Sequence, residues 1–342
     1  MSSTRVPVGT RAARTGDAPV QRRPVWRGYL PVFVVAILLG LVPLALSDSR
    51  YFMGLASLAL VSAAYAVGFN IIFGDTNQLF LCQGALAGVG AYGSGILGNE
   101  LGWPMWLGIL AGMAVAGLLG AAFSWVSVRR RLDVIFVGIV TLAFSLVFTN
   151  LLLGQRDLTG GETGLVILSD PGIVGERGLG AYYVFLVVLV GFLTLHRLLQ
   201  RSHIGWAFRA LRDDELAAEL SGVNVARFKI VAGVVGSMML ALVGGLYAHY
   251  EGFVSPTTFE LGQLDVPVLV ALAFGGIGSL TGPVVGAVVF TAVDELLREL
   301  SQLRTTVYGL ILLALFLGFR RGVVPMAGDL IARMTRRRQQ RD

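Results

Sequence analysis

The sequence is short of charge and of the residues from which catalytic and metal centres are built. Charged residues make up 14% of the 342, and there are one cysteine, three histidines and one lysine. The single cysteine, Cys82, excludes an intrachain disulfide and argues against a cysteine-ligated metal. The single lysine, Lys229, precedes Ile230, whereas a Walker A loop needs Gly-Lys followed by Ser or Thr. If ATP drives this protein, another polypeptide therefore binds it.

Groups for catalysis or ion coupling are also scarce in the apolar stretches. We find no zinc motif, no G-x-S-x-G motif and no plausible pair of catalytic acids. Asp265, Asp294 and Glu295 lie only at the ends of the predicted spans, whereas ion-coupled carriers usually keep ionisable groups near the middle of the membrane. The histidines are interpreted as interfacial polar residues. The pattern argues against an enzyme and a self-powered transporter, and predicts no cofactor.

The chain is rich in apolar residues. Hydrophobic residues make up 55% and glycine occurs 45 times, as closely packed membrane helices allow. A helix needs about 20 mostly apolar residues to cross the hydrocarbon layer. We therefore predict an all-α, polytopic membrane protein with about ten spans: Leu30–Leu46, Tyr51–Gly74, Leu79–Leu97, Met105–Val128, Val134–Leu153, Ala181–Leu195, Ile230–Ala248, Val266–Phe274, Pro283–Val293 and Thr305–Phe319.

Loop charges orient these spans. Basic clusters lie in the N-terminal tail, at 129–131, in the insert 201–229 and in the C-terminal tail. Ten spans place all four on one side, which the positive-inside rule makes cytoplasmic. The net charge of +6 is thus interpreted as membrane orientation and lipid contact, with no nucleic-acid binding.

We expect three parts along the chain. Residues 1–28 form a basic, disordered cytoplasmic tail, 29–320 the transmembrane domain, and 321–342 a second basic cytoplasmic tail. The alternative is that the first span is a signal peptide, whose cleavage would leave nine spans.

The charged segment 201–228 lies between two apolar spans. We predict one helix over Gly205–Leu220, ended by Gly222, with Phe208, Leu211, Glu215 and Ala218 on one stripe. Such a helix docks in a groove of an ATPase or lies on anionic lipid, and the acidic run 213–215 favours a protein partner. The candidate coupling residues are Arg209, Arg212, Asp213, Glu215, Ala217, Ala218 and Gly222.

Two further sets of residues are candidates for a pathway or gate. Asn70, Gln78, Gln83, Thr141 and Ser145 are polar groups in apolar surroundings, which favours the bundle interior, the pathway or bonds between helices. The stretch 274–286 has five glycines and a proline in thirteen residues, so it predicts a broken or re-entrant element. That element is a gate or a packed turn, and its candidate residues are Gly275, Gly276, Gly278 and Ser279.

Six segments together resemble one family. They are GFNIIFGDTNQLFLCQGALAGVGAY at 68–92, VIFVGIVTLAF at 134–144, LTGGETGL at 158–165, GWAFRALRDDELAAELSGVNVARFK at 205–229, GLYAHYEGFVSP at 245–256 and GGIGSLTGPVVGA at 275–287. In this order they resemble the branched-chain amino-acid ABC transporter permeases, in particular the longer-chain subunit. Within the fourth segment, Leu216-Ala217-Ala218 and Gly222 resemble the "EAA…G" loop of ABC import permeases.

The resemblance implies an ABC importer permease fold in a bacterial inner membrane. It implies a related second permease, two cytoplasmic ABC ATPases and an extracytoplasmic solute-binding protein that delivers branched-chain or similar hydrophobic amino acids. Two departures bear on the substrate: Phe80-Leu81-Cys82-Gln83 replaces a stretch of small residues, and Ser145-Leu146 follows TLAF where "GE" is common. The alternatives are urea, amides or another small organic solute, and then an ion-coupled carrier or channel.

Overall fold

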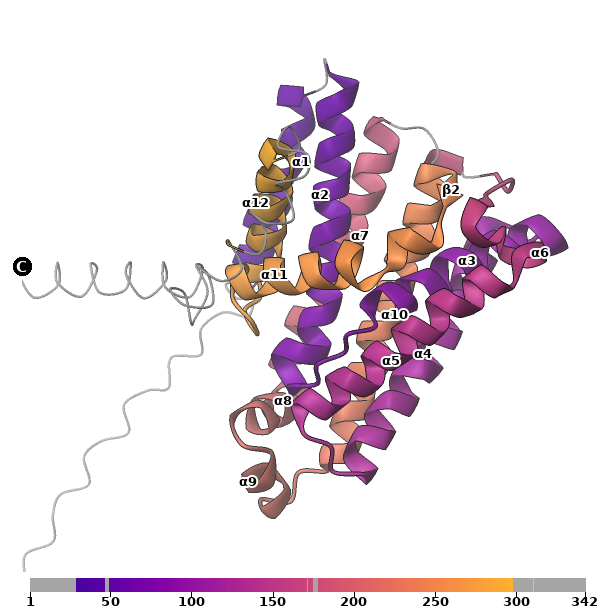
Figure 1. Ribbon diagram of the computed structural model, residues 1–342. Coiled ribbons are helices and arrows are strands. Elements are labelled where there is room, and N and C mark those ends of the chain that lie inside the picture. Colours follow the sequence, from indigo (N-terminus) through magenta and orange to yellow (C-terminus); the bar gives the residue numbers. More distant parts are fainter. Residues whose placement is uncertain (1–28, 47–48, 171, 175–177, 298–309, 311–342) are drawn as a thin grey trace, which may run out of the picture.

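The protein is a bundle of helices, seen in the computed structural model of Figure 1. The structure describes residues 29–297 and 310, apart from 47–48, 171 and 175–177. The predicted tails 1–28 and 321–342 lie outside the described residues, as does the predicted span Thr305–Phe319 apart from residue 310.

Five of the described helices are long and apolar enough to cross a membrane. They are α2 (Arg50–Phe69, continued by the π-helix η2, Asn70–Gly74), α4 (Met105–Arg129), α5 (Val134–Gly154), α7 (Leu179–Arg201) and α10 (Val225–Glu251). Each coincides with a predicted span, so these five helices are confirmed. The total of ten spans stays a prediction.

Shorter helices surround these five. α1 (Leu30–Leu46) packs beside α2 and α7, and α3 (Gln83–Leu101) lies against α4 and α10. α11 (Val266–Gly275) runs across the bundle and α12 (Gly282–Leu297) rises beside α2 (Figure 1). α8 (His203–Asp213) and α9 (Glu215–Leu220) form one end of the molecule.

The opposite end holds the short elements: α6 (Arg156–Thr159), η3 (Gly161–Thr163), η4 (Gly172–Val174) and the strands β1 (Leu165–Val166) and β2 (Phe253–Val254). The strands pair antiparallel, with Leu165 opposite Val254. This two-stranded ladder is the one departure from the predicted all-α class among the described residues. η5 (Pro256–Phe259) and η6 (Leu261–Asp265) lead from β2 into α11.

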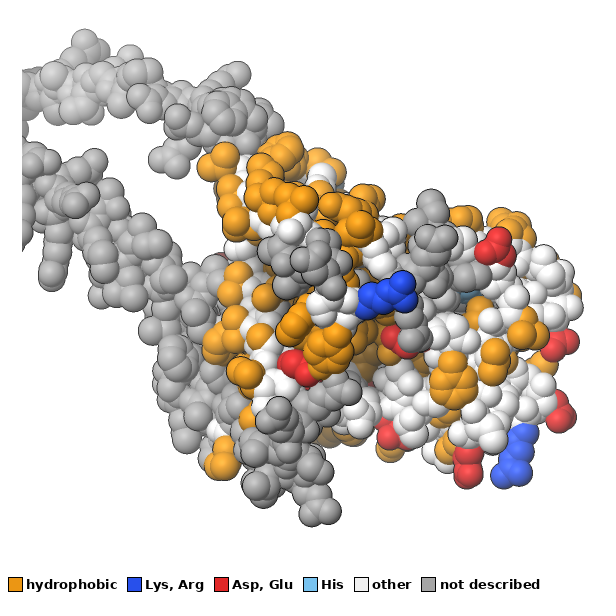
Figure 2. All heavy atoms as spheres, turned by 90° about the horizontal axis from the view of Figure 1, so that it is seen from above, with side chains coloured by type: hydrophobic (Ala, Val, Ile, Leu, Met, Phe, Trp, Pro, Cys, Tyr) orange, Lys and Arg blue, Asp and Glu red, His pale blue; other side chains and the backbone are white. Residues whose placement is uncertain are grey.

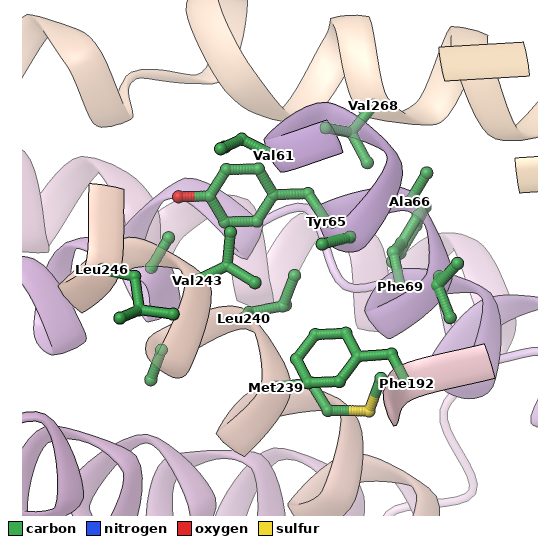
Figure 3. Packing of buried hydrophobic residues seen from close by; sticks show 14 of the residues in the cluster. Val61, Tyr65, Ala66, Phe69, Phe192, Met239, Leu240, Val243, Leu246 and Val268 are labelled. Carbon is green, nitrogen blue, oxygen red and sulfur yellow. The ribbon is translucent and has the colours of Figure 1, made fainter. Parts of the chain in front are cut away.

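α10 is the centre of the core. Its residues Met239, Leu240, Val243 and Leu246 meet Val61, Tyr65, Ala66 and Phe69 of α2, with Phe192 of α7 and Val268 of α11 beside them (Figure 3). On its other sides α10 meets α3 and α4 almost backbone to backbone. A Cβ on Gly244 would collide with the Ala87 carbonyl, and a Cβ on Gly90 would collide with that of Ala241. Small residues thus bring these three helices close, as in other membrane bundles.

Two predicted helices were wrong in extent. The predicted span Leu79–Leu97 begins only at Gln83, because Asn77 takes a left-handed φ of 56° and ends the preceding helix. The predicted helix Gly205–Leu220 is two helices, because Asp214 leaves the helical conformation (φ −160°) and its carboxylate accepts a hydrogen bond from Ala217 N. Asp favours such an N-cap position over a helix interior.

Candidate functional site

Two interruptions of the helices lie next to η2: one follows it in the chain, and the other packs against it, because a Cβ on Gly74 would collide with Gly278 N. The first break is residues 77–82, between η2 and α3, and the second break is residues 276–281, between α11 and α12. Gly276 and Gly278 have φ values of 117° and 74°, a region that glycine enters readily. The predicted broken element at 274–286 is thereby confirmed. Gly275 is also required there, because a Cβ on it would collide with the Gly282 carbonyl.

The Asn70 side chain joins the second break to η2. Asn70 is fully buried in η2. Its Oδ1 accepts a hydrogen bond from Gly278 N at 2.7 Å, and its Nδ2 donates to the Ser279 carbonyl at 2.9 Å. The Ser279 hydroxyl in turn donates to the Gly276 carbonyl at 2.7 Å. One side-chain amide therefore satisfies an N–H and a carbonyl of the half-buried, non-helical backbone of the second break.

The first break is tied to two other helices. Gln78 Nε2 donates to Thr76 Oγ1 at 2.9 Å and to the Lys229 carbonyl of α10 at 3.0 Å. Leu81 N donates to Thr141 Oγ1 of α5 at 2.9 Å. Ser145 is buried one turn further along the same face of α5. The predicted candidates Gln78 and Thr141 thus hold the extended backbone of this break in place.

The segment 201–228 reaches both breaks. Phe208, Leu211 and Ala218 are buried, as their predicted stripe requires, and the fourth member, Glu215, forms a 2.6 Å ion pair with Lys229 Nζ. Lys229 is the same residue whose carbonyl holds Gln78. In α8 the Arg212 guanidinium lies where a Cβ on Gly278 would be. Two of the candidate coupling residues, Arg212 and Glu215, thus form one cluster with candidate gate residues that are far from them in sequence.

The outward face of the segment is apolar and charged. Trp206 is 71% exposed and Leu220 is 81% exposed, and the Arg209 guanidinium stacks 4.5 Å from the centre of the Trp206 ring. Asp213 and Ala217 are exposed, and Gly222 (φ 86°) follows the end of α9 as predicted. A groove of about 420 Å³ opens here, lined by His203, Trp206, Ala207, Gly222, Val223, Asn224, Arg227 and Phe228.

Two buried ionisable groups, Asp265 and Asp75, are functional-site candidates that the sequence did not indicate. Asp265, placed at a span end by the sequence, is fully buried, and its Oδ1 accepts hydrogen bonds from Gln83 N and Gly84 N at 2.5 and 3.2 Å. The backbone amides at the start of α3 need an acceptor, and Asp265 supplies it. Asp75 pairs with His196 of α7 at 2.8 Å, and both are buried, a pairing that the sequence did not predict. No single-sequence signal pairs residues so distant.

Gln83 is the predicted candidate that the cluster does not include. It is fully buried at the start of α3, and neither polar atom of its side chain has a hydrogen-bond partner among the described residues. Within the same described part of the chain, no group of three His, Cys, Asp or Glu residues is placed to hold a metal.

Comparison with known proteins decides the family. Residues 51–319 match the family described as branched-chain amino acid transport system, permease component. The chain belongs to the branched-chain amino-acid ABC permease family. It is therefore a multi-pass membrane protein and a permease of the ABC importer type.

Individual relatives of this permease are moderately similar in sequence. It is 27% identical to the high-affinity branched-chain amino acid transport system permease LivM of Escherichia coli K12, over 86% of this chain and 75% of LivM. It is 24% identical to LivH of Salmonella typhimurium, over 68% of this chain and 80% of LivH. It is 29% identical to the autoinducer 2 import system permease LsrC of an Enterobacter species, over 76% of this chain and 74% of LsrC. No solved structure matches the permease.

Proposed function

We propose that this chain is a permease subunit of an ATP-driven importer in a bacterial inner membrane, and that it forms part of the pathway for branched-chain amino acids. In this proposal α8 and α9 face the cytoplasm together with both termini, and ten helices cross the membrane. ATP is hydrolysed on two separate ATPase subunits, because the chain has no Walker A loop.

The observation that carries the proposal is the contact of the segment 201–228 with both helix breaks. Glu215 reaches the first break through Lys229, and Arg212 lies against the second. A displacement of this segment therefore acts directly on the non-helical backbone in the bundle interior. Non-helical backbone at membrane depth occurs only inside protein or beside water, which makes the two breaks the best candidates for a gate.

The outward face of the same segment supports docking on a protein and not on lipid. Acidic Asp213 and Asp214 are exposed there beside Trp206 and Leu220. Anionic lipid headgroups repel carboxylates, whereas an ATPase with an apolar pocket and a basic rim would complement this surface.

The opposite face supports contact with an extracytoplasmic solute-binding protein. Figure 2 shows more acidic than basic side chains on this face. In the sequence between α5 and α7, Asp157, Glu162 and Asp170 are exposed. The low basic content is what the positive-inside rule expects outside the cell. A second, related permease would complete the pathway, and α5, whose outer side exposes Phe136, Ile139 and Val147, offers an apolar surface for it or for lipid.

The substrate assignment rests on relatives. LivM and LivH are named for branched-chain amino acids, whereas LsrC is named for autoinducer 2. We assign branched-chain amino acids because the matching family and the LivM match both point there, and keep another small organic solute as the second candidate because of LsrC.

Co-purification with ATPase subunits tests the proposal. We expect the wild-type chain to retain co-expressed ATPases in detergent and Trp206→Glu to lower their yield at least tenfold, because it places a charge in the apolar contact. Leu168→Glu, at a residue 78% exposed at the other end of the molecule, is the matched control and keeps the yield. A folded wild-type chain that never retains an ATPase would overturn the proposal.

A further inference from the structure

Lys229 occupies an unusual position for a lysine in a membrane protein. It is the single lysine of the sequence, it lies in the first turns of α10, and only 6% of its side chain is exposed. Lysine is almost never buried unless it is paired, and an unpaired buried ammonium is strongly disfavoured. The residue therefore depends on its partner.

That partner lies on a different element. Lys229 Nζ is 2.6 Å from Glu215 Oε2, and half of the Glu215 side chain is exposed. Glu215 is the first residue of α9, a six-residue helix in which Ala218 is the one buried side chain. Because separating the pair would leave a buried charge without a counterion, α9 and the start of α10 move together.

The backbone of the same lysine holds the first break. The Lys229 carbonyl accepts a hydrogen bond from Gln78 Nε2 at 3.0 Å, and Gln78 also donates to Thr76 Oγ1 at 2.9 Å. Thr76 Oγ1 in turn donates to the Ile72 carbonyl of η2 at 2.7 Å. An unbroken series of polar contacts thus leads from the surface helix α9 to the π-helix that carries Asn70.

We propose that Lys229 is the positioning residue through which displacement of α9 reaches the first helix break. The proposal rests on the proposed function only in taking ATPase motion as the cause that displaces α9. The link between α9 and the first break does not depend on that function. The Lys229 side chain holds α9 through its ion pair with Glu215, and the Lys229 carbonyl accepts a hydrogen bond from Gln78. Neither contact touches substrate or nucleotide.

Hydrogen exchange on the full-length permease in lipid nanodiscs tests the link without any ATPase. Glu215→Ala removes the partner of Lys229, and Glu219→Ala, an exposed acid on the same helix, is the matched control. We expect amide exchange in residues 77–82 to become at least fivefold faster in Glu215→Ala and to stay within twofold in Glu219→Ala. Equal exchange in the two variants would overturn the proposal.

A transport measurement distinguishes two effects of a mutation: loss of the link between α9 and the first break, and loss of ATPase binding. In the complex with its ATPases we expect Glu215→Ala to lower ATP-dependent leucine uptake at least tenfold while the ATPases still co-purify and hydrolyse ATP. The reversed pair, Glu215→Lys with Lys229→Glu, restores a substantial part of the uptake. Loss of ATPase binding in Glu215→Ala, or no rescue by the reversed pair, would contradict the proposal. A wild-type chain that binds no ATPase would refute the proposed function and leave the exchange result to decide the link.

Discussion

At the scale of single residues, Asn70 shows how one side chain connects two elements that are far apart in the sequence. Its amide makes two hydrogen bonds to the second break, one as acceptor and one as donor. The amide carries its donor and its acceptor on two separate atoms, so it reaches two backbone groups at once. The residue therefore fixes how η2 and the second break face each other.

Replacing Asn70 tests this role. Asn70→Ala leaves the half-buried Gly278 amide and Ser279 carbonyl without that partner, and an unsatisfied group costs about 1–3 kcal/mol when it is fully buried. We expect a clearly lower melting temperature in detergent and at least tenfold lower leucine uptake. Asn150→Ala, an exposed asparagine that bonds only the Leu146 carbonyl of its own helix, is the control. A variant Asn70→Ala as stable and active as Asn150→Ala would contradict this account.

Individual residues also show which buried polar groups can be predicted from a single sequence and which cannot. Asn70, Gln78 and Thr141 were identifiable because an isolated amide or hydroxyl in an apolar run needs a partner, wherever that partner lies. Asp265 and Lys229 could not be identified as buried, because each lies next to a predicted span end, where the sequence alone suggests contact with water. Their burial results from elements more than a hundred residues away, or from a surface helix folding back, which residue type and spacing do not encode.

At the scale of elements, α8 and α9 show how one residue divides a helix. Asp214 has an extended conformation, and its carboxylate accepts from Ala217 N at 3.0 Å. The division turns α9 so that Glu215 points to Lys229 while Leu216 and Leu220 stay exposed. The orientation of the exposed face of α9, where we propose that the ATPase docks, therefore depends on this cap.

Removal of the cap tests that dependence. Asp214→Ala should cost about 1 kcal/mol of local stability and make amide exchange in residues 215–220 several-fold faster, with a corresponding loss of ATPase retention. Asp213→Ala is the matched control, because this neighbouring acid ends α8, where a carboxylate opposes the helix dipole. Faster exchange in Asp213→Ala than in Asp214→Ala would show that Asp214 does not hold α9.

Elements were easier to predict than their interruptions. Five long apolar runs gave five helices, because length and hydropathy largely decide such segments, but α7 ends at Arg201 and not at Leu195, and α10 begins at Val225 and not at Ile230. The break at 276–281 was foreseeable from its glycines. The break at 77–82 was not, because Leu79, Phe80 and Leu81 are as apolar as a span, and only the hydrogen bond from Leu81 N to Thr141 shows how the extended backbone is satisfied.

At the scale of the whole molecule, the chain brings together two regions that the sequence could only describe separately. A charged segment at one end and two helix breaks in the interior are connected by Arg212, Glu215 and Lys229. Motifs in the sequence pointed to the family, and the family match confirms it. The arrangement by which motion of α8 and α9 would reach the interior is a property of the tertiary structure.

The most direct test of the central claim is uptake of radiolabelled leucine into proteoliposomes that contain this permease, its related permease and the ATPases. We predict uptake that requires ATP inside and the solute-binding protein outside, and that is unaffected when the proton and sodium gradients are collapsed. Leucine uptake that persists without ATP and disappears with either ion gradient would contradict the account and identify an ion-coupled carrier.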